Sequence, residues 1–285
     1  MAHKSELTPS GHLRCSYNRQ VAYKQIDSPK NPTVKDLVRL RERRVREREG
    51  RYLIEGTREV QRAVQAGVSI QELFVCPALL RPEGETLVKR LTLPRTDLSE
   101  AAFSRVSLRQ NPDGVLATAA VTPEELTSLT LKENALVLVI DGVEKPGNVG
   151  ALLRTADAAD LDAVFVTGAG TDLYNPNVIR ASVGSVFSRP VLAVETEELL
   201  EFLQAKNFAL VATTPDAERI YWEESYVGSS AIILGTEHEG LGRVWLENAT
   251  TRVRIPMHGL ADSLNVSVSG ALLLFEALRQ RASVS

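Results

Sequence analysis

Three short polar stretches in the second half of the chain contain the residue types that could bind a ligand or assist a reaction. They run from Asp141 to Gly150, from Leu234 to Gly242 and from Ile255 to Asn265. Each comes after an apolar run, and their glycines let the backbone turn sharply and expose N–H and C=O groups. Taken singly, each stretch is more typical of an ordinary turn or a helix cap than of a ligand site.

The first stretch places Asn148 where its side chain could cap a following helix. Arg154, about a turn and a half later, could project toward the same end of that helix. The glycines at 142, 147 and 150 do not have the G-x-G-x-x-G spacing of a dinucleotide site, and there is no Walker lysine. The sequence therefore does not predict either nucleotide motif here.

The second and third stretches combine backbone donors with polar side chains. Gly235 and Gly240 suit a tight loop whose free N–H and C=O groups could hold an adenine edge or a ribose, and Glu237 adds a carboxylate. Ser263 and Asn265 stand at the entrance of a C-terminal helix, where a hydroxyl or amide normally caps free N–H groups. A loop rich in such donors is also a natural place for a ligand.

The elements that must position these loops form an alternating pattern. Continuous apolar runs at 135–140, 163–166, 208–212 and 231–234 are typical of strands covered on both faces, and a shorter strand ends at Ile255. Helices are expected between them at 149–159, 176–183, 196–206 and 265–280. This order predicts an α/β domain over residues 135–285 with a mostly parallel sheet, in which ligands collect at the carboxyl ends of the strands.

The first half of the chain predicts a smaller α/β domain over residues 32–121. Strands are expected at 52–54, 72–75 and 115–121, and helices at 34–48, 57–66, 85–90 and 99–107. Residues 122–134 have the composition of a linker. Residues 1–31 lack apolar periodicity, which predicts a flexible N-terminal tail.

The predicted helix from Val34 to Arg48 has strongly basic faces. Residues 39–51 contain seven arginines and three glutamates. Arginine pairs bidentately with phosphate and stacks on bases, so this segment could contact RNA. Glutamates three or four residues from arginines could instead form pairs along a solvated helix, and the segment alone favours neither reading. The candidate RNA-binding residues of the chain are Arg39, Arg43, Arg44, Arg46 and Arg58.

Composition limits the possible classes of protein. With 285 residues, 44% of them apolar, the chain can build one or two domains with real cores. It contains no apolar run long enough to span a bilayer, and its first residues lack the apolar centre that a signal peptide would have. Its two cysteines, Cys15 and Cys76, cannot form a disulfide framework or a zinc site. We therefore expect a cytoplasmic protein without a metal or a membrane partner. A net charge of −3 means that any nucleic-acid binding must use a local patch.

Together, and in this order at strand ends, the three stretches resemble a known family. Residues 141–158, 234–241 and 255–268 look like the three signature motifs of the SpoU (TrmH-type) RNA 2′-O-ribose methyltransferases, which belong to the SPOUT superfamily. The resemblance covers about residues 135–280. More loosely, residues 52–60 (Tyr-Leu-Ile-Glu-Gly-Thr-Arg-Glu-Val) resemble the substrate-binding domain of the rRNA-modifying branch.

The resemblance implies a deep trefoil knot in the C-terminal domain, S-adenosylmethionine as cofactor, and a homodimer whose active site lies at the interface. The residues that match the family's functional polar positions are Asn148, Arg154, Glu237, Ser263 and Asn265. Those expected to contact the cofactor, largely through backbone atoms, are Thr213, Thr214, Gly235, Gly240, Ile255, Met257 and Leu264.

The implied reaction transfers a methyl group to a ribose 2′-OH of RNA. The family's arginine at the position of Arg154 has been proposed as the base, but a guanidinium is effectively always protonated, so we expect Arg154 to grip a phosphate and orient the hydroxyl. Glu237 could pair with an arginine across the interface or orient its loop.

The substrate and the function class have alternatives. Ribosomal RNA, of the large subunit, is favoured over tRNA because the family's minimal tRNA enzymes usually lack an N-terminal domain, and an antibiotic-resistance role is open. The other classes considered are a non-catalytic RNA-binding protein and a nucleotide-dependent oxidoreductase, which would need the missing phosphate motif.

Overall fold

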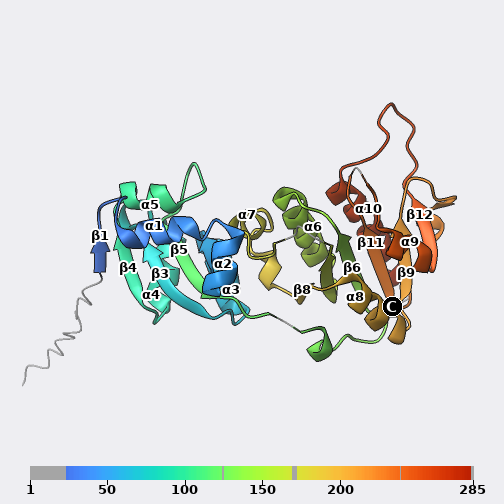
Figure 1. Cartoon of the computed structure of the whole chain (residues 1–285), viewed down its shortest axis with the longest axis horizontal. Coiled ribbons are helices and arrows are strands. Elements are labelled where there is room, and N and C mark those ends of the chain that lie inside the picture. Colours follow the sequence, from blue (N-terminus) through green and yellow to red (C-terminus); the bar gives the residue numbers. More distant parts are fainter. Residues whose placement is uncertain (1–23, 124, 169–171, 238, 284–285) are drawn as a thin grey trace, which may run out of the picture.

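The computed structural model describes residues 24–123, 125–168, 172–237 and 239–283. Two α/β units lie side by side along the long axis of the molecule (Figure 1). Among the residues described, no helix is both long and apolar enough to cross a membrane.

The N-terminal unit is a five-stranded mixed sheet with the strand order β1-β4-β3-β5-β2. Strand β5 runs antiparallel to β2 and β3, and the other pairs are parallel. The elements are β1 (Lys24–Ile26), α1 (Pro32–Arg39), α2 (Arg43–Glu49), β2 (Arg51–Glu55), α3 (Thr57–Gln65), β3 (Ile70–Val75), α4 (Pro82–Arg90), β4 (Arg95–Leu98), α5 (Glu100–Val106) and β5 (Val115–Ala120).

The structure differs from the sequence-based expectation at the start of this unit. Residues 24–26, assigned to the flexible tail, form β1 beside β4, and Ile26 is buried in the core. Residues 1–23, with Cys15, lie outside the described residues. The single helix expected at 34–48 is two helices, because the chain turns at 40–42 to bury both Leu40 and Val45.

The C-terminal unit is a seven-stranded sheet with the order β10-β12-β9-β11-β6-β7-β8, and all its pairings are parallel within the described part of the chain. The expected parallel α/β architecture is confirmed, and the knot stays a prediction. The elements are β6 (Leu136–Asp141), α6 (Pro146–Ala158), β7 (Ala163–Thr167), α7 (Pro176–Ala181), β8 (Val191–Ala193), α8 (Thr196–Ala205), β9 (Ala209–Thr213), β10 (Arg219–Ile220), β11 (Ser230–Leu234), α9 (Arg243–Asn248), β12 (Thr251–Arg254) and α10 (Val266–Ala282).

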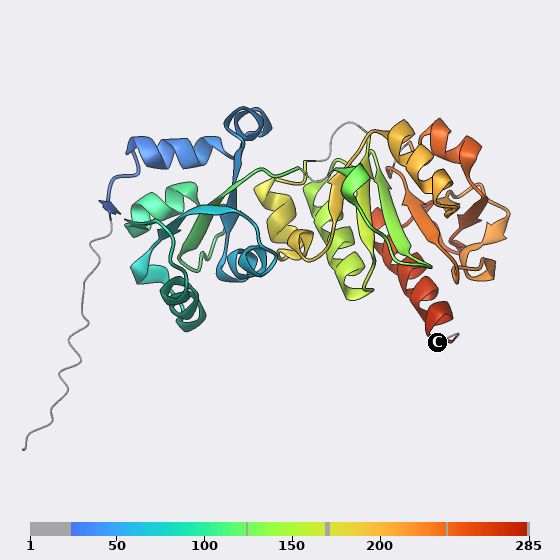
Figure 2. The same ribbon diagram turned by 90° about the horizontal axis from the view of Figure 1, so that it is seen from below.

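Helices cover both faces of this sheet, which explains why its strands are apolar throughout. Figure 2 shows α6 and α10 on one side and α8 and α9 on the other. Leu152 and Leu273 belong to the core under the first pair, and Leu199 and Trp245 belong to the core under the second. With both faces filled, the carboxyl ends of the strands remain the place where loops can gather around a ligand.

The two units share a packed junction. The ring of Tyr52 on β2 lies 4.7 Å, centroid to centroid, from the ring of Tyr174 just before α7. A guanidinium N–H of Arg62 donates to the carbonyl of Val183 at 2.9 Å. One hydrophobic cluster runs continuously through both units. The segment 125–134 that joins them contributes Leu126 to the core, while Glu124 lies outside the described residues.

Arg46 is the residue for which the sequence-based assignment fails most clearly. Its side chain is only 3% exposed, forms an ion pair with Asp172 of the C-terminal unit and donates to the carbonyl of Leu40 at 2.6 Å. A guanidinium buried in this way has no surface to offer to a phosphate, so Arg46 stabilises the junction and does not contact RNA.

This role gives a stability prediction. Arg46→Ala leaves the carboxylate of Asp172 buried without its counter-charge, so we expect the free energy of unfolding to fall by about 3–5 kcal/mol. The matched control is Arg43→Ala on the same helix, where the ion pair with Glu47 is more than half exposed and contributes less than about 1 kcal/mol. Urea unfolding of both variants measures the difference, and equal losses would contradict the role given to Arg46.

Candidate active site

Loops from three strands meet at the carboxyl edge of the C-terminal sheet and border a cavity of about 350 Å³, here called the strand-end cavity. The loops follow β9, β11 and β12, and the start of α10 closes the cavity. All seven residues proposed from the sequence as cofactor contacts line it, namely Thr213, Thr214, Gly235, Gly240, Ile255, Met257 and Leu264. Thr213 and Leu264 therefore line the same cavity, although they are 51 positions apart along the chain.

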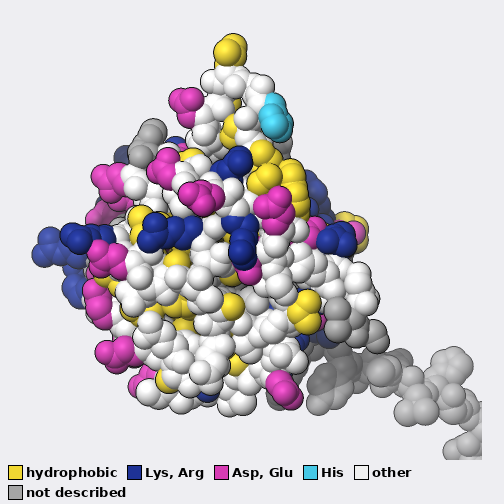
Figure 3. All heavy atoms as spheres, turned by 90° about the vertical axis from the view of Figure 1, so that its right-hand side faces the viewer, with side chains coloured by type: hydrophobic (Ala, Val, Ile, Leu, Met, Phe, Trp, Pro, Cys, Tyr) yellow, Lys and Arg dark blue, Asp and Glu magenta, His cyan; other side chains and the backbone are white. Residues whose placement is uncertain are grey.

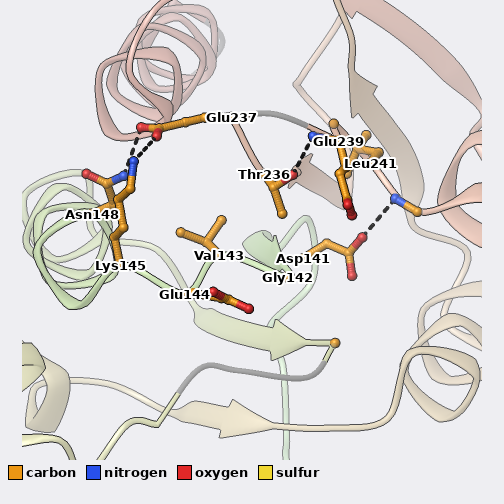
Figure 4. Close-up of a pocket in the computed structure, with 13 residues that line it drawn as sticks. Asp141, Gly142, Val143, Glu144, Lys145, Asn148, Thr236, Glu237, Glu239 and Leu241 are labelled. Atoms are coloured by element: carbon orange, nitrogen blue, oxygen red, sulfur yellow. Dashed lines mark hydrogen bonds and ion pairs between the residues drawn. The ribbon is translucent and has the colours of Figure 1, made fainter.

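The loop after β11 has its shape because residue 235 is glycine. A Cβ atom at Gly235 would lie 2.1 Å from the carbonyl oxygen of Gly240, closer than any side chain allows. The backbone N–H of Thr236 donates to that same carbonyl at 2.9 Å. The hydroxyl of Thr236 accepts from the N–H of Glu239 at 2.9 Å, as Figure 4 shows. The loop is thus folded back on itself and presents backbone groups at the cavity.

The cavity combines apolar walls with polar groups that have unused bonding capacity. Leu234 and Val266 are buried in its walls, beside the partly buried Leu264. The hydroxyl oxygen of Thr213 is buried and has no hydrogen-bond partner among the described residues. Asp216 adds an exposed carboxylate at the rim. Apolar walls with a few placed polar groups are what a small-molecule site requires.

The carboxylate of Glu237 ties the three polar loops together beside this cavity. Its Oε1 accepts from the side-chain amides of Asn148 and Asn265, each at 2.9 Å, and its Oε2 accepts from Lys145 Nζ at 2.6 Å. The amide of Asn265 also donates to Asn148 Oδ1 at 3.1 Å. Figure 4 shows Glu237 reaching toward Lys145 and Asn148. The structure therefore brings together three of the five polar residues proposed from the sequence.

This network corrects one sequence-based assignment and supports another. Asn148 does not cap α6, because the helix begins at Pro146 and Lys145 holds the N-cap position. Its amide is used for Glu237 instead. Asn265 is the N-cap of α10, as expected, and its Oδ1 accepts from the N–H of Ser267 at 3.0 Å.

Lys145 lowers the pKa of Glu237. The hydrogen bond from Lys145 is the largest cause, and the amide of Asn148 contributes in the same direction. The carboxylate therefore stays ionised at neutral pH. Within this chain it links the loops through hydrogen bonds, as the loop-orienting role of the two left open by the sequence would require.

Arg154 and Ser263 lie apart from this network. Ser263 is exposed and lines the strand-end cavity. Arg154 is exposed on α6, does not line the cavity, and has no hydrogen-bond or ion-pair partner in the described parts of the chain. Within the part of the chain that the structure describes, its guanidinium is therefore unheld.

Two residues of the first polar stretch were not singled out from the sequence but hold the site together. Lys145 anchors Glu237. Asp141, at the end of β6, is nearly buried and accepts from the hydroxyl of Thr167 at 2.8 Å and from the N–H of Gly242 at 3.0 Å. Both border a second cavity of about 600 Å³ on the other side of the Glu237 loop, which Figure 4 views directly. For Asp141, the available sequence signal was its position as a charged residue directly after an apolar strand.

The other proposed RNA-binding arginines are exposed, in contrast to Arg46. Arg39 lies 4.0 Å from Asp36, and Arg43 pairs with Glu47 at 2.7 Å, as the solvated-helix reading proposed. Arg44 and Arg58 are exposed and have no hydrogen-bond or ion-pair partner among the residues that the structure describes. On the face of the C-terminal unit in Figure 3, positive and negative side chains are interspersed. Among the described residues no group of three His, Cys, Asp or Glu side chains could hold a metal ion.

The Glu237 network predicts a pH dependence. Because the pKa of Glu237 is lowered in the folded protein, the stability it adds is complete above the ordinary value of 4.5 and is lost as the pH falls through the lowered value. We expect Glu237→Gln to lower the melting temperature at pH 7, and we expect this difference from wild type to shrink below pH 4.5. Thermal unfolding between neutral and acidic pH measures it; a difference that does not change with pH would contradict the role of the ionised carboxylate.

Comparison with known proteins places this site in a family. Residues 135–275 match the model of the SpoU rRNA methylase family, and residues 31–117 match an MRM3-like substrate binding domain. The chain is 34% identical over 253 residues to the 23S rRNA (guanosine(2553)-2′-O)-methyltransferase RlmP of Bacillus subtilis, covering 88% of this chain and 98% of that protein.

Solved structures agree with both units. A crystal structure of an RNA 2′-O ribose methyltransferase is 50% identical, with a TM-score of 0.82 over 90% of this chain and 99% of the other. The SpoU methyltransferase AviRb from Streptomyces viridochromogenes, crystallised with the cofactor AdoMet, is 26% identical, with a TM-score of 0.83 over 89% of this chain and 99% of that chain. With matches to both units and to the full length of its relatives, the chain belongs to the SpoU family of rRNA methylases.

Proposed function

We propose that the protein transfers a methyl group from S-adenosylmethionine to a ribose 2′-OH of large-subunit ribosomal RNA. One observation carries this proposal. Seven residues proposed from the end of β9 and from the second and third motifs line a single strand-end cavity, and the Glu237 network links all three motifs beside it. The names of similar proteins, which are 23S rRNA 2′-O-methyltransferases, support the same reaction and substrate.

The strand-end cavity fits S-adenosylmethionine by its chemistry. The apolar walls suit an adenine ring, while the loop around Gly235 and the unpartnered hydroxyl of Thr213 can bond its polar edges and ribose. When bound, this cofactor supplies a methyl group on a sulfonium that an oxygen nucleophile can attack. Because the loop around Gly235 is fixed by its own backbone contacts, the cavity can hold the cofactor in one orientation. Methyl transfer requires this, since the sulfonium methyl must lie in line with the attacking hydroxyl.

The polar residues around the cavity act by positioning. Glu237 accepts from three donors, so its carboxylate is occupied and is not free to take a proton from the substrate. Asn148 and Asn265 fix the loops that flank the ribose. Arg154 has no partner among the described residues, and because guanidinium stays protonated we assign it to the phosphate beside the target ribose.

A homodimer explains why Arg154 is remote from the cavity of its own chain. Three apolar side chains of α10, Val268, Leu272 and Phe275, are between 36% and 47% exposed and share one face of the helix. Helix α10 packs against α6, which carries Arg154. A second copy that covers this apolar face would bring the α6 helices and the cavities of two chains near one another. The expected location of the enzyme is the cytoplasm, where rRNA substrates of bacterial relatives are made.

The substrate proposal is tested with labelled cofactor. The purified protein is incubated with labelled S-adenosylmethionine and separate pools of unmodified rRNA and tRNA, and ribose methylation is mapped in the product. We expect label in 23S rRNA only. Label confined to tRNA would keep the reaction and overturn the substrate, whereas cofactor binding without label in either pool would favour a non-catalytic RNA-binding protein.

Arg154→Ala should reduce turnover by about a hundredfold or more, and it should leave the affinity for S-adenosylmethionine nearly unchanged. Calorimetry measures cofactor binding, and Arg243→Ala, which removes an exposed arginine of α9, is the control. If Arg154 acts across a dimer, mixing Arg154→Ala with the cavity variant Gly235→Val should restore part of the activity. Loss of cofactor binding in Arg154→Ala would contradict the assigned role, and a failure of mixed subunits to recover any activity would contradict action across the interface.

A further inference from the structure

A third cavity, of about 670 Å³, opens where the two units meet, and we call it the junction cavity. It is lined from the N-terminal unit by Thr57 and Arg58 at the start of α3, by Arg81 at the start of α4 and by Arg109. The C-terminal unit contributes Arg180 and Val183 from α7 and the residues after it. Neither the reaction nor the cofactor site uses these side chains.

The charges of the junction cavity leave guanidinium groups without acidic partners. Four arginines and three acidic residues line it. Arg109 pairs with the buried Glu59 at 2.7 Å, and Asp113 accepts through Oδ2 from the N–H of Thr57 at 2.8 Å, while its Oδ1 has no partner in the described chain. Arg58 and Arg81 are exposed and form no hydrogen bond or ion pair with any residue that the structure describes. Glu83, the remaining carboxylate, is exposed.

Other groups of the cavity are also prepared for a polar ligand. Thr57 is only 9% exposed, and its hydroxyl oxygen has no partner in the described chain. From the opposite wall, Arg180 directs one N–H to the carbonyl of Leu108 at 3.1 Å, which holds its side chain across the junction. Its remaining N–H groups are available, because a guanidinium has five.

The position of the cavity links it to the active site. Helix α7 lies between α3 and α6 in both ribbon views (Figures 1 and 2). At the crossing of α6 and α7, a Cβ atom at Gly150 would lie 2.4 Å from the Cβ of Ala181. Arg154 is one helical turn after Gly150, and Arg180 directly precedes Ala181. Arg180 of the junction cavity and Arg154, the residue assigned to the target phosphate, therefore lie on two helices that are in direct contact.

We propose that the junction cavity binds the sugar–phosphate backbone of the substrate RNA, a few nucleotides away from the methylated ribose, with Arg58, Arg81 and Arg180 gripping phosphates from both units. This inference rests on the proposed RNA substrate and adds the surface that recognises it. Arginine suits the task because its planar fork bonds phosphate oxygens bidentately. Rigid coupling of the two units, through Arg46 and Arg62, would then hold the bound strand at a fixed distance from the strand-end cavity.

The test uses the full-length protein and compares arginines that line the junction cavity with a nearby arginine that does not. The double variant Arg58→Ala/Arg81→Ala removes the two unpaired cations, and Arg90→Ala, at the other end of α4, removes an exposed arginine that does not line the cavity. Binding of an unmodified 23S rRNA transcript is measured at several salt concentrations, together with its methylation and with calorimetric binding of S-adenosylmethionine.

For the double variant we expect RNA affinity to fall at least about tenfold, since each substitution removes a charge-assisted contact to a phosphate. The salt dependence of binding should weaken by about one to two released counterions, while cofactor affinity stays as in wild type. Arg180→Ala should weaken RNA binding in the same way, and Arg90→Ala should behave as wild type.

The outcomes separate this inference from the proposed function. If wild type methylates the transcript but the double variant binds RNA with unchanged affinity, or if Arg90→Ala loses as much, the junction cavity is not the RNA site. If wild type neither binds nor methylates rRNA, the proposed function fails, and the inference that rests on it fails too.

Discussion

The site depends on one interaction at the edge of the sheet, the carboxylate of Glu237 held by donors from two other loops. Asn148 and Asn265 lie 89 and 28 residues away along the chain, yet both amides reach the same oxygen. A carboxylate accepts several donors at once, so one side chain can fix three loops without a metal ion or a disulfide. The same three bonds engage both of its oxygens, which supports the positioning role proposed for Glu237.

The parallel sheet makes this convergence possible. Its strands are covered on both faces, so the chain can place polar groups only at the strand ends, and the ends of β6, β9, β11 and β12 all open toward one edge. Glycine then sets the loop shapes. Gly235 allows the contact with the carbonyl of Gly240 that closes the loop after β11, and Gly150 lets α6 approach α7. These two glycines therefore determine both the packing of the helices and the shape of a loop that borders the strand-end cavity.

The N-terminal unit is fixed to this sheet by charge and aromatic contacts. The buried pair of Arg46 and Asp172, the packing of Tyr52 on Tyr174 and the bond from Arg62 to Val183 cross the junction at separate points. Such a junction joins the two α/β units into one continuous surface. The proposed RNA site at the junction cavity requires this continuity. The family match to both units is consistent with this arrangement.

The sequence by itself determined the parallel α/β fold and the three polar loops, because apolar runs and glycine-rich loops are local signals, whereas the residues that line the strand-end cavity were named from the resemblance to the SpoU family. It could not show that Asn148 bonds Glu237 instead of capping α6, that residues 24–26 complete a sheet, or that Arg46 is buried while Arg58 is exposed. Those outcomes depend on which distant segment packs against each residue. Arginines in a charged stretch look alike along the chain, and only the tertiary structure decided which of them faces a partner and which faces solvent.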